Sequence, residues 1–278
     1  MRLNRSASIH WQLTPQMLLR DLFVAGLFTL VGFAAPARSL QTTSEVKLSV
    51  EDPRPVAQAI LILEDRYGWV VTYEDPRYSH DSEISDVTLK VRRDLDKYKP
   101  GEAPKVFIPK GGALEFTYGV ATSTNLPNDP AIVLQKLLDA QTASDHGGRF
   151  RIESSGKIMH VIPTAIKNRK GQLVPQESVL DMRISLPAKE RTVVQKLEDV
   201  CAALSQATQV RVELGTIPES WFSRHRDSQG AVRQRARDIL IDTFKTLDFG
   251  TNLSWRLLYG PRSNRYSLNI HLVSKRPN

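Results

Sequence analysis

The stretch from Val46 to Pro76, VKLSVEDPRPVAQAILILEDRYGWVVTYEDP, shows the pattern that decides the fold. Apolar residues alternate with polar ones over 46–50, which predicts a strand. Pro55 suits the first turn of a helix, and apolar residues follow at spacings of three and four. Gly68 can take the left-handed conformation that ends such a helix. The aromatic and β-branched run 69–73 predicts a second strand. The stretch is therefore one β-α-β unit.

The residues that follow complete a first half of the chain. A polar insert, 77–112, separates the β-α-β unit from the next alternating run, and its segment 105–109 has the composition of a short strand. Asn128 or Asp129 is a suitable N-cap for a helix that begins at Pro130. The remaining elements expected in this half are a strand at 114–118, the helix with its apolar residues at 132–138, and a hairpin of 150–153 with 158–162.

The second half repeats this order of elements. We expect strands at 182–186 and 210–214 with a helix at 189–207 between them, then a loop over 215–230, a helix at 231–248, and strands at 253–259 and 266–272. The strand of the first half at 114–118 is absent or disguised in the second. Leu137 and Leu240 occupy matched places on the later helix of each half, so both are expected to be buried.

The repetition predicts an α+β protein of two tandem small domains. Each has the order β-α-β-(β)-α-β-β, with the helices packed between small sheets. The polar segment 164–178, which contains Gly171 and Pro175, shows no periodicity and is the expected linker. The predicted organisation is a signal peptide at 1–37, a first domain at 44–163 with the insert 77–112, the linker 164–178 and a second domain at 179–275.

The N-terminal segment is typical of a secretory signal peptide. Residues 1–21 are basic, the uncharged apolar run 22–35 follows, and Ala35-Pro36-Ala37 has the small-x-small pattern of a cleavage site. The apolar run is shorter than the roughly 20 residues of a membrane helix, so no stable membrane span is expected after cleavage. An uncleaved anchor helix is the alternative. The mature protein is expected to be periplasmic or secreted.

The charge and the single cysteine restrict the possible functions. The net charge is +8, but basic and acidic residues are mixed along the chain, as in Arg92-Arg93-Asp94, which favours a solvated surface over a nucleic-acid interface. The one cysteine, Cys201, excludes an internal disulfide and lies on an apolar helical stripe with Leu197 and Leu204. It is more typical of a small buried apolar residue than of a nucleophile.

Some of these residues resemble the short N-terminal (STN) domain shared by secretins and TonB-dependent receptors. The stretch Pro55–Ile60 through Gly68, followed by Tyr73-Glu74-Asp75-Pro76, resembles the first helix and the turn of that family. The helix 132–138 and the hairpin after it resemble the later part. The resemblance covers about 44–163 and more loosely 180–273. It implies two helices held between two small sheets, and contact with other envelope proteins.

The sequence shows no recognisable catalytic or cofactor motif, so we expect no enzyme activity, no cofactor and no metal site. A cluster of His80, Asp81, Glu83 and Asp86 matches no known metal-binding loop and is more typical of a solvated acidic loop. The loop Ser223 to Asp227 brings together the residue types of a catalytic triad, but proximity in sequence is weak evidence for one. A periplasmic enzyme of unrecognised type remains the alternative.

The loop 216–228 is the expected partner-binding site. It carries Trp221, Phe222 and Arg224, and aromatic residues and Arg are the usual anchors of protein interfaces. The alternative is that Trp221 and Phe222 fold back onto the core of the second domain. We therefore predict an exported interaction module that binds another protein of the cell envelope through this loop and an adjacent, unpaired sheet edge, with no nucleic-acid partner.

Overall fold

The computed structural model describes residues 43–127, 129–144, 147–247 and 252–274. The predicted signal peptide, 1–37, lies outside the described residues. Within the described part of the chain, no helix is both long enough and apolar enough to cross a membrane.

The first half has the predicted order of elements. Gly68 ends its first helix in the left-handed conformation (φ 68°), and the Asp129 side chain caps its second helix at Pro130. The elements are β1 (Thr43–Asp52), α1 (Pro55–Tyr67), β2 (Val70–Glu74), β5 (Gly112–Ala121), α3 (Pro130–Ala143), β6 (Arg149–Ser155) and β7 (Ile158–Lys167). Between β2 and β5, the insert forms β3 (Ile84–Asp86), α2 (Thr88–Val91) and β4 (Phe107–Pro109).

The second half has the same order, and one prediction is wrong there. Residues 231–235 form a strand, not the start of a helix, because they pair with the strand at 183–186. The second half therefore does contain a counterpart of the strand expected at 114–118 in the first half. The elements are β9 (Arg183–Leu186), β10 (Arg191–Thr192), α4 (Val193–Thr208), β11 (Arg211–Leu214), α5 (Glu219–Phe222), β12 (Arg226–Asp227), β13 (Ala231–Arg235), α6 (Ala236–Lys245), β14 (Asn252–Gly260) and β15 (Arg265–Val273).

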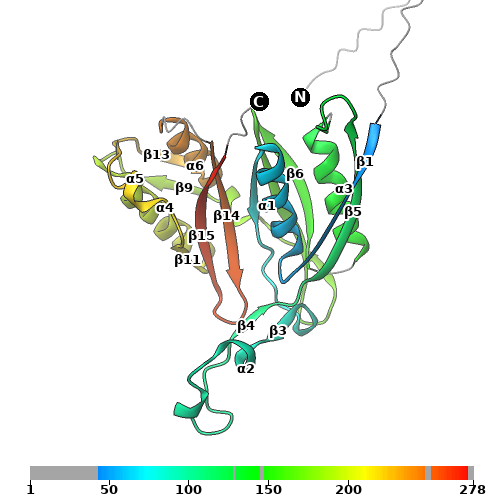
Figure 1. The fold of residues 1–278 in the computed structure, drawn as a ribbon. Helices are drawn as coiled ribbons and strands as arrows, with labels where there is room; N and C mark the ends of the chain where they lie inside the picture. The colour runs from blue at the N-terminus through cyan, green and yellow to red at the C-terminus, as the bar shows by residue number, and fades with distance from the viewer. Residues whose placement is uncertain (1–42, 128, 145–146, 248–251, 275–278) are drawn as a thin grey trace, which may run out of the picture. The chain divides into compact units, whose positions relative to one another are not determined.

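The strand pairing is also the same in both halves. β1 pairs with β5 and β9 with β13, each antiparallel. β2 runs parallel to β7, which pairs antiparallel with β6; likewise β11 runs parallel to β15, which pairs antiparallel with β14. In the first half, α1 and α3 contact strands of both sheets, and α4 does so in the second (Figure 1). Both halves therefore hold helices between a two-stranded sheet and a larger mixed sheet.

The two halves are joined in one sheet, which argues against two separate small domains. β14 pairs in parallel with β2, so that the strand order is β11-β15-β14-β2-β7-β6, with β8 (Leu173–Pro175) pairing with β7 as the seventh strand. The segment expected to be an irregular linker thus contains the end of β7 and all of β8. The sequence could not predict the pairing of β2 with β14, because the two strands are far apart along the chain.

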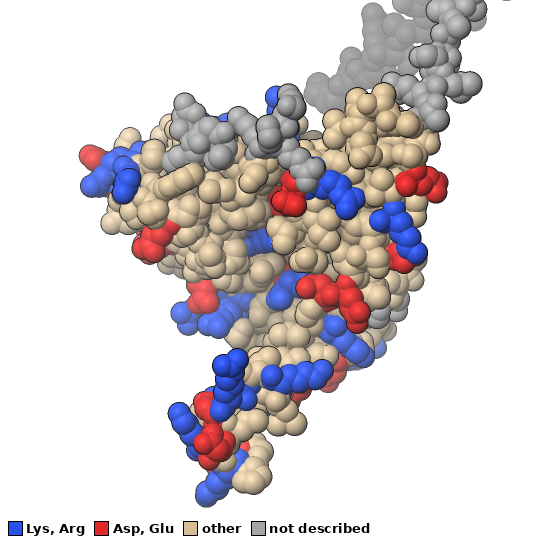
Figure 2. All heavy atoms as spheres, in the orientation of Figure 1, with Lys and Arg blue, Asp and Glu red and all other residues tan. Residues whose placement is uncertain are grey.

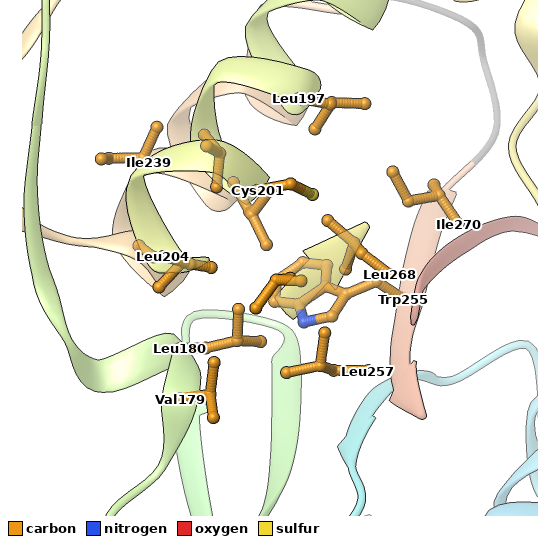
Figure 3. Packing of buried hydrophobic residues seen from close by; sticks show 14 of the residues in the cluster. Val179, Leu180, Leu197, Cys201, Leu204, Ile239, Trp255, Leu257, Leu268 and Ile270 are labelled. Carbon is orange, nitrogen blue, oxygen red and sulfur yellow. The ribbon is translucent and has the colours of Figure 1, made fainter. Parts of the chain in front are cut away.

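The helices of the two halves cover opposite faces of this sheet. On β2, Tyr73 lies in the core of the first half, whereas the next residue, Glu74, faces Arg237 of α6. Its register partner Leu257 lies in the core of the second half, beside Trp255 (Figure 3). Successive side chains of a strand point to opposite faces, so the face of β2 that α1 leaves uncovered is covered by the second half.

Buried charged groups hold the joint together. Glu74 accepts hydrogen bonds from Ser178 and from the backbone N–H of Val179, and pairs with the buried Arg237 at 3.2 Å. Burial raises the pKa of the Glu74 carboxyl, while Arg237 opposes that shift. The neighbouring Asp75 accepts from Arg54 Nε at 2.6 Å and from the backbone N–H of Tyr259 at 2.9 Å. These carboxylates therefore fix the end of β2 against β14 and α6.

Candidate partner-binding site

The predicted binding loop leaves the main sheet from an edge strand. Among the described residues, β11 pairs with β15 alone, so its other edge is open. The chain stays beside β15 for two more residues, because Gly215 N–H donates to Leu268 O and Ile270 N–H donates to Thr216 O. Charged side chains occupy the open edge, where Arg211 pairs with Glu213 at 3.2 Å. Charged side chains on an exposed edge strand commonly disfavour its pairing with a strand of another chain.

Phe222 is a core residue, which favours the alternative that its ring folds back onto the core of the second half. It is fully buried, and its ring stacks on that of Phe244 in α6 with centroids 6.0 Å apart. A buried aromatic ring contributes a large apolar area to the core of a fold. Phe222 therefore anchors α5 to the second half.

Trp221 and Arg224 lie on the outer side of the same short helix and the turn after it. Trp221 is 37% exposed, although its neighbour in sequence is buried. Arg224 is exposed, and its backbone N–H donates to Trp221 O at 3.2 Å. His225 Nδ1 lies 2.9 Å from the same carbonyl. Two of the three predicted residues are thus together on an accessible surface.

The far end of the loop is fixed by a buried ion pair. Lys196 Nζ of α4 lies 2.7 Å from Asp227 Oδ2, and both side chains are almost fully buried. Asp227 Oδ1 also accepts the backbone N–H of Gln229 at 2.7 Å. Both carboxylate oxygens of Asp227 are therefore used to hold the loop, and neither orients a histidine that the structure describes, as the aspartate of a catalytic triad does.

A β-bulge follows the loop and carries residues that the sequence did not single out. Val232 on β13 is 87% exposed, and Arg233 has a φ of 48°, in the left-handed region. This conformation costs an ordinary residue roughly 1–2 kcal/mol. Hydrogen bonds from Arg233 N–H to Ser185 Oγ and from Arg183 to Arg233 O hold it. The only sequence signal for this bulge is the run Ala-Val-Arg-Gln-Arg, which is too polar for the buried face of a helix.

The arginines of this segment are free for a partner. The guanidinium groups of Arg224, Arg226 and Arg233 form no ion pair with any residue that the structure describes. Elsewhere, on the face shown in Figure 2, basic and acidic side chains are interspersed. The candidate site thus combines one partly exposed tryptophan with arginines that form no ion pair with described residues, on and just after a loop whose ends are fixed.

Other chemically active side chains are used inside the fold. Cys201 is buried on α4, as expected (Figure 3), and burial raises the pKa of its thiol to about 12, so the nucleophilic thiolate is scarce near neutral pH. His160 on β7 is fully buried, and its Nδ1 lies 2.7 Å from Thr72 Oγ1. In the described ranges, no group of three or more His, Cys, Asp or Glu side chains is placed to hold a metal ion.

Comparisons with models of protein families, with curated proteins and with solved structures found no match. The resemblance to the STN domain stays a prediction.

Proposed function

We propose that this chain is a non-enzymatic interaction module that binds another protein of the cell envelope, through Trp221 and Arg224 beside the open edge of β11. The proposal rests on the difference in solvent exposure between two neighbouring residues of α5. Phe222 is fully buried and Trp221 is 37% exposed, beside Arg224, which forms no ion pair with a described residue. The envelope location rests on the signal peptide expected at 1–37.

The fixed ends of the loop favour this use. Phe222 holds one end on α6, and the buried pair of Lys196 with Asp227 holds the other on α4. A loop that is already ordered loses little conformational entropy when a partner binds, so more of the contact energy appears as affinity. Tryptophan and arginine are enriched among the residues that dominate such interfaces.

Affinity capture tests the proposal. The mature protein, residues 38–278, is immobilised, exposed to envelope extract, and the retained proteins are identified by mass spectrometry. We expect a specific protein to be retained, and Trp221→Ala to weaken its binding by about 2 kcal/mol, or roughly 30-fold, without changing the melting temperature.

Two control variants sharpen the result. Leu61 of α1 is 39% exposed, so Leu61→Ala removes a comparably exposed apolar side chain from the first half and should not change capture. Phe222→Ala should destabilise the fold by about 3–5 kcal/mol. If Trp221→Ala lowers the melting temperature and leaves capture unchanged, Trp221 is a core residue. If no protein is retained and the mature chain turns over a substrate, the interaction-module proposal fails.

A further inference from the structure

A groove lies where three loops of the two halves meet, away from α5. Its volume is about 990 Å³. One wall is the segment after β2, from Arg77 to Asp81; the second is the turn between β7 and β8, with Asn168 and Arg169; the third is the turn between β14 and β15, with Arg262 and Asn264. The side chains of the buried Tyr78 and Tyr259 line its inner part.

Two of the three arginines in the groove have no carboxylate partner among the residues that the structure describes. Arg262 pairs with Asp81 at 2.9 Å. Arg77 instead donates through Nη2 to the amide oxygen of Asn264 at 2.8 Å, which positions the guanidinium without neutralising it. Arg169 forms no ion pair with a described residue. The groove therefore presents unneutralised positive charge.

Hydrogen bonds position the Arg77 guanidinium and the backbone turn that carries Arg169. Asn264 Oδ1 also accepts from Tyr259 OH at 3.1 Å, so the acceptor of Arg77 is itself fixed. Arg169 lies in a tight turn that Asn168 closes, since Asn168 Oδ1 accepts the backbone N–H groups of Lys170 and Gln172 at 2.9 and 3.0 Å. Charged donors that are held in position bind an anion at lower entropic cost than mobile surface arginines.

A second cavity continues the groove, and apolar side chains form about half of its lining. It has a volume of about 390 Å³ and shares Arg77 and Ile166 with the first. Its walls include Val179, Met182 and Val210, and one exposed carboxylate, Glu177. The two cavities together place a group of apolar side chains next to a basic site along one surface.

We infer that this groove binds an extended acidic peptide segment of a partner protein. Carboxylates of the peptide pair with Arg77 and Arg169, and an apolar side chain beside them enters the cavity lined by Val179 and Met182. Arg77, which lies in both cavities, faces the position between these two parts of the peptide. The inference is independent of the proposed function, because none of these residues belongs to the loop that carries Trp221.

Selection from a random 12-residue peptide library displayed on phage tests the inference on the mature protein. We expect the retained peptides to share Asp or Glu next to an apolar residue. A labelled copy of the most enriched peptide is then measured by fluorescence anisotropy. Arg77→Ala and Arg169→Ala should each weaken its binding about 10-fold, as the loss of one charge-assisted contact does.

Matched variants make the outcome decisive. Arg93 of the insert is also exposed and forms no ion pair with a described residue, so Arg93→Ala should leave peptide binding unchanged. Trp221→Ala should do the same, which separates this groove from the site of the proposed function. The inference is overturned if no peptide is enriched, if the enriched peptides lack acidic residues, or if Arg77→Ala and Arg93→Ala have equal effects.

Discussion

The two halves share one topology and differ in the segment that each carries at one position. In the first half this segment follows β2 and precedes β5; in the second it follows β11 and precedes β13. The first has the insert with β3, α2 and β4, and its residues after β2 line the basic groove. The second has the loop with Trp221. The repeated elements thus supply the core, and the same connection in each copy supplies a different surface.

The small outer sheets differ as well. β1 and β5 pair without interruption from Thr43–Ala121 to Asp52–Gly112. β9 and β13 are shorter, and their register shifts at the bulge that exposes Val232. A regular pair of strands presents its side chains in strict alternation. A bulge, by contrast, turns one side chain outward at a local cost in strain. The second half therefore departs further from a purely structural repeat.

The largest expected effect comes from breaking the joint between the halves. Arg237→Ala removes the partner of the buried Glu74 and leaves its carboxylate uncompensated, which should lower the free energy of unfolding by about 3–5 kcal/mol. Denaturant unfolding of the mature protein measures this cost. Arg235→Ala is the matched control, since Arg235 pairs with Glu153 and Asp238 at partly exposed positions and should cost about 1 kcal/mol or less. Equal costs would show that the buried pair of Arg237 with Glu74 stabilises the fold no more than the partly exposed pairs of Arg235 do.

The next largest effect is expected from removing one buried leucine side chain from the core of each half. Leu137 and Leu240 are both fully buried, as the helical spacing predicted. Each Leu→Ala change should cost about 2–5 kcal/mol, through lost burial and the cavity left behind. Because one sheet runs through both halves, we expect each variant to unfold in a single transition. Two separate transitions, of which each variant shifts only one, would restore the picture of independent domains.

A smaller effect concerns the face of the first half that the second half covers. Burial lowers the pKa of His160 from 6.5 to about 4, with the charge of Arg237 acting in the same direction. Below pH 6.5 the unfolded chain binds a proton at His160 that the folded chain does not bind, so stability falls as the pH drops towards 4, by up to about 3 kcal/mol. Above pH 6.5 this contribution is fully present.

Urea unfolding at several pH values checks this expectation. Carboxylates titrate in the same range, so the informative quantity is the difference between the parent protein and His160→Gln. That difference should change between pH 6.5 and 4 and be constant above 6.5. A parallel pH dependence in both proteins would mean that His160 accepts its proton in the folded state.

The sequence predicted the elements whose patterns are local and missed those that depend on distant partners. The β-α-β unit at 46–76, the Asp129 cap and the closing hairpins follow from periodicity and capping within a few residues. β13 was missed, because Ala231–Arg235 lacks clear alternation and becomes a strand only against β9. The joint was missed for the same reason: Glu74 and Asp75 have the composition of a turn, and nothing near them in sequence shows that Arg237 and Tyr259 bury them.

The candidate site was predictable in part. The composition of 216–228 identified Trp221, Phe222 and Arg224 as unusual for a loop, but it could not assign the two rings to different environments. That assignment depends on Phe244, which lies on α6. The basic groove was not predictable, because its arginines come from three loops separated along the chain, and each is an ordinary polar loop residue in its own context.

The position of β2 has a consequence for biosynthesis. Every residue of this strand is buried in the finished sheet, yet one of its edges is completed only by β14, as in the bond from Ser254 Oγ to Val71 O across 183 residues of chain. A chain synthesised from its N-terminus presents this edge of β2 unpaired until nearly all of the chain has been made. Prematurely terminated chains, which lack β14, should therefore aggregate or be degraded.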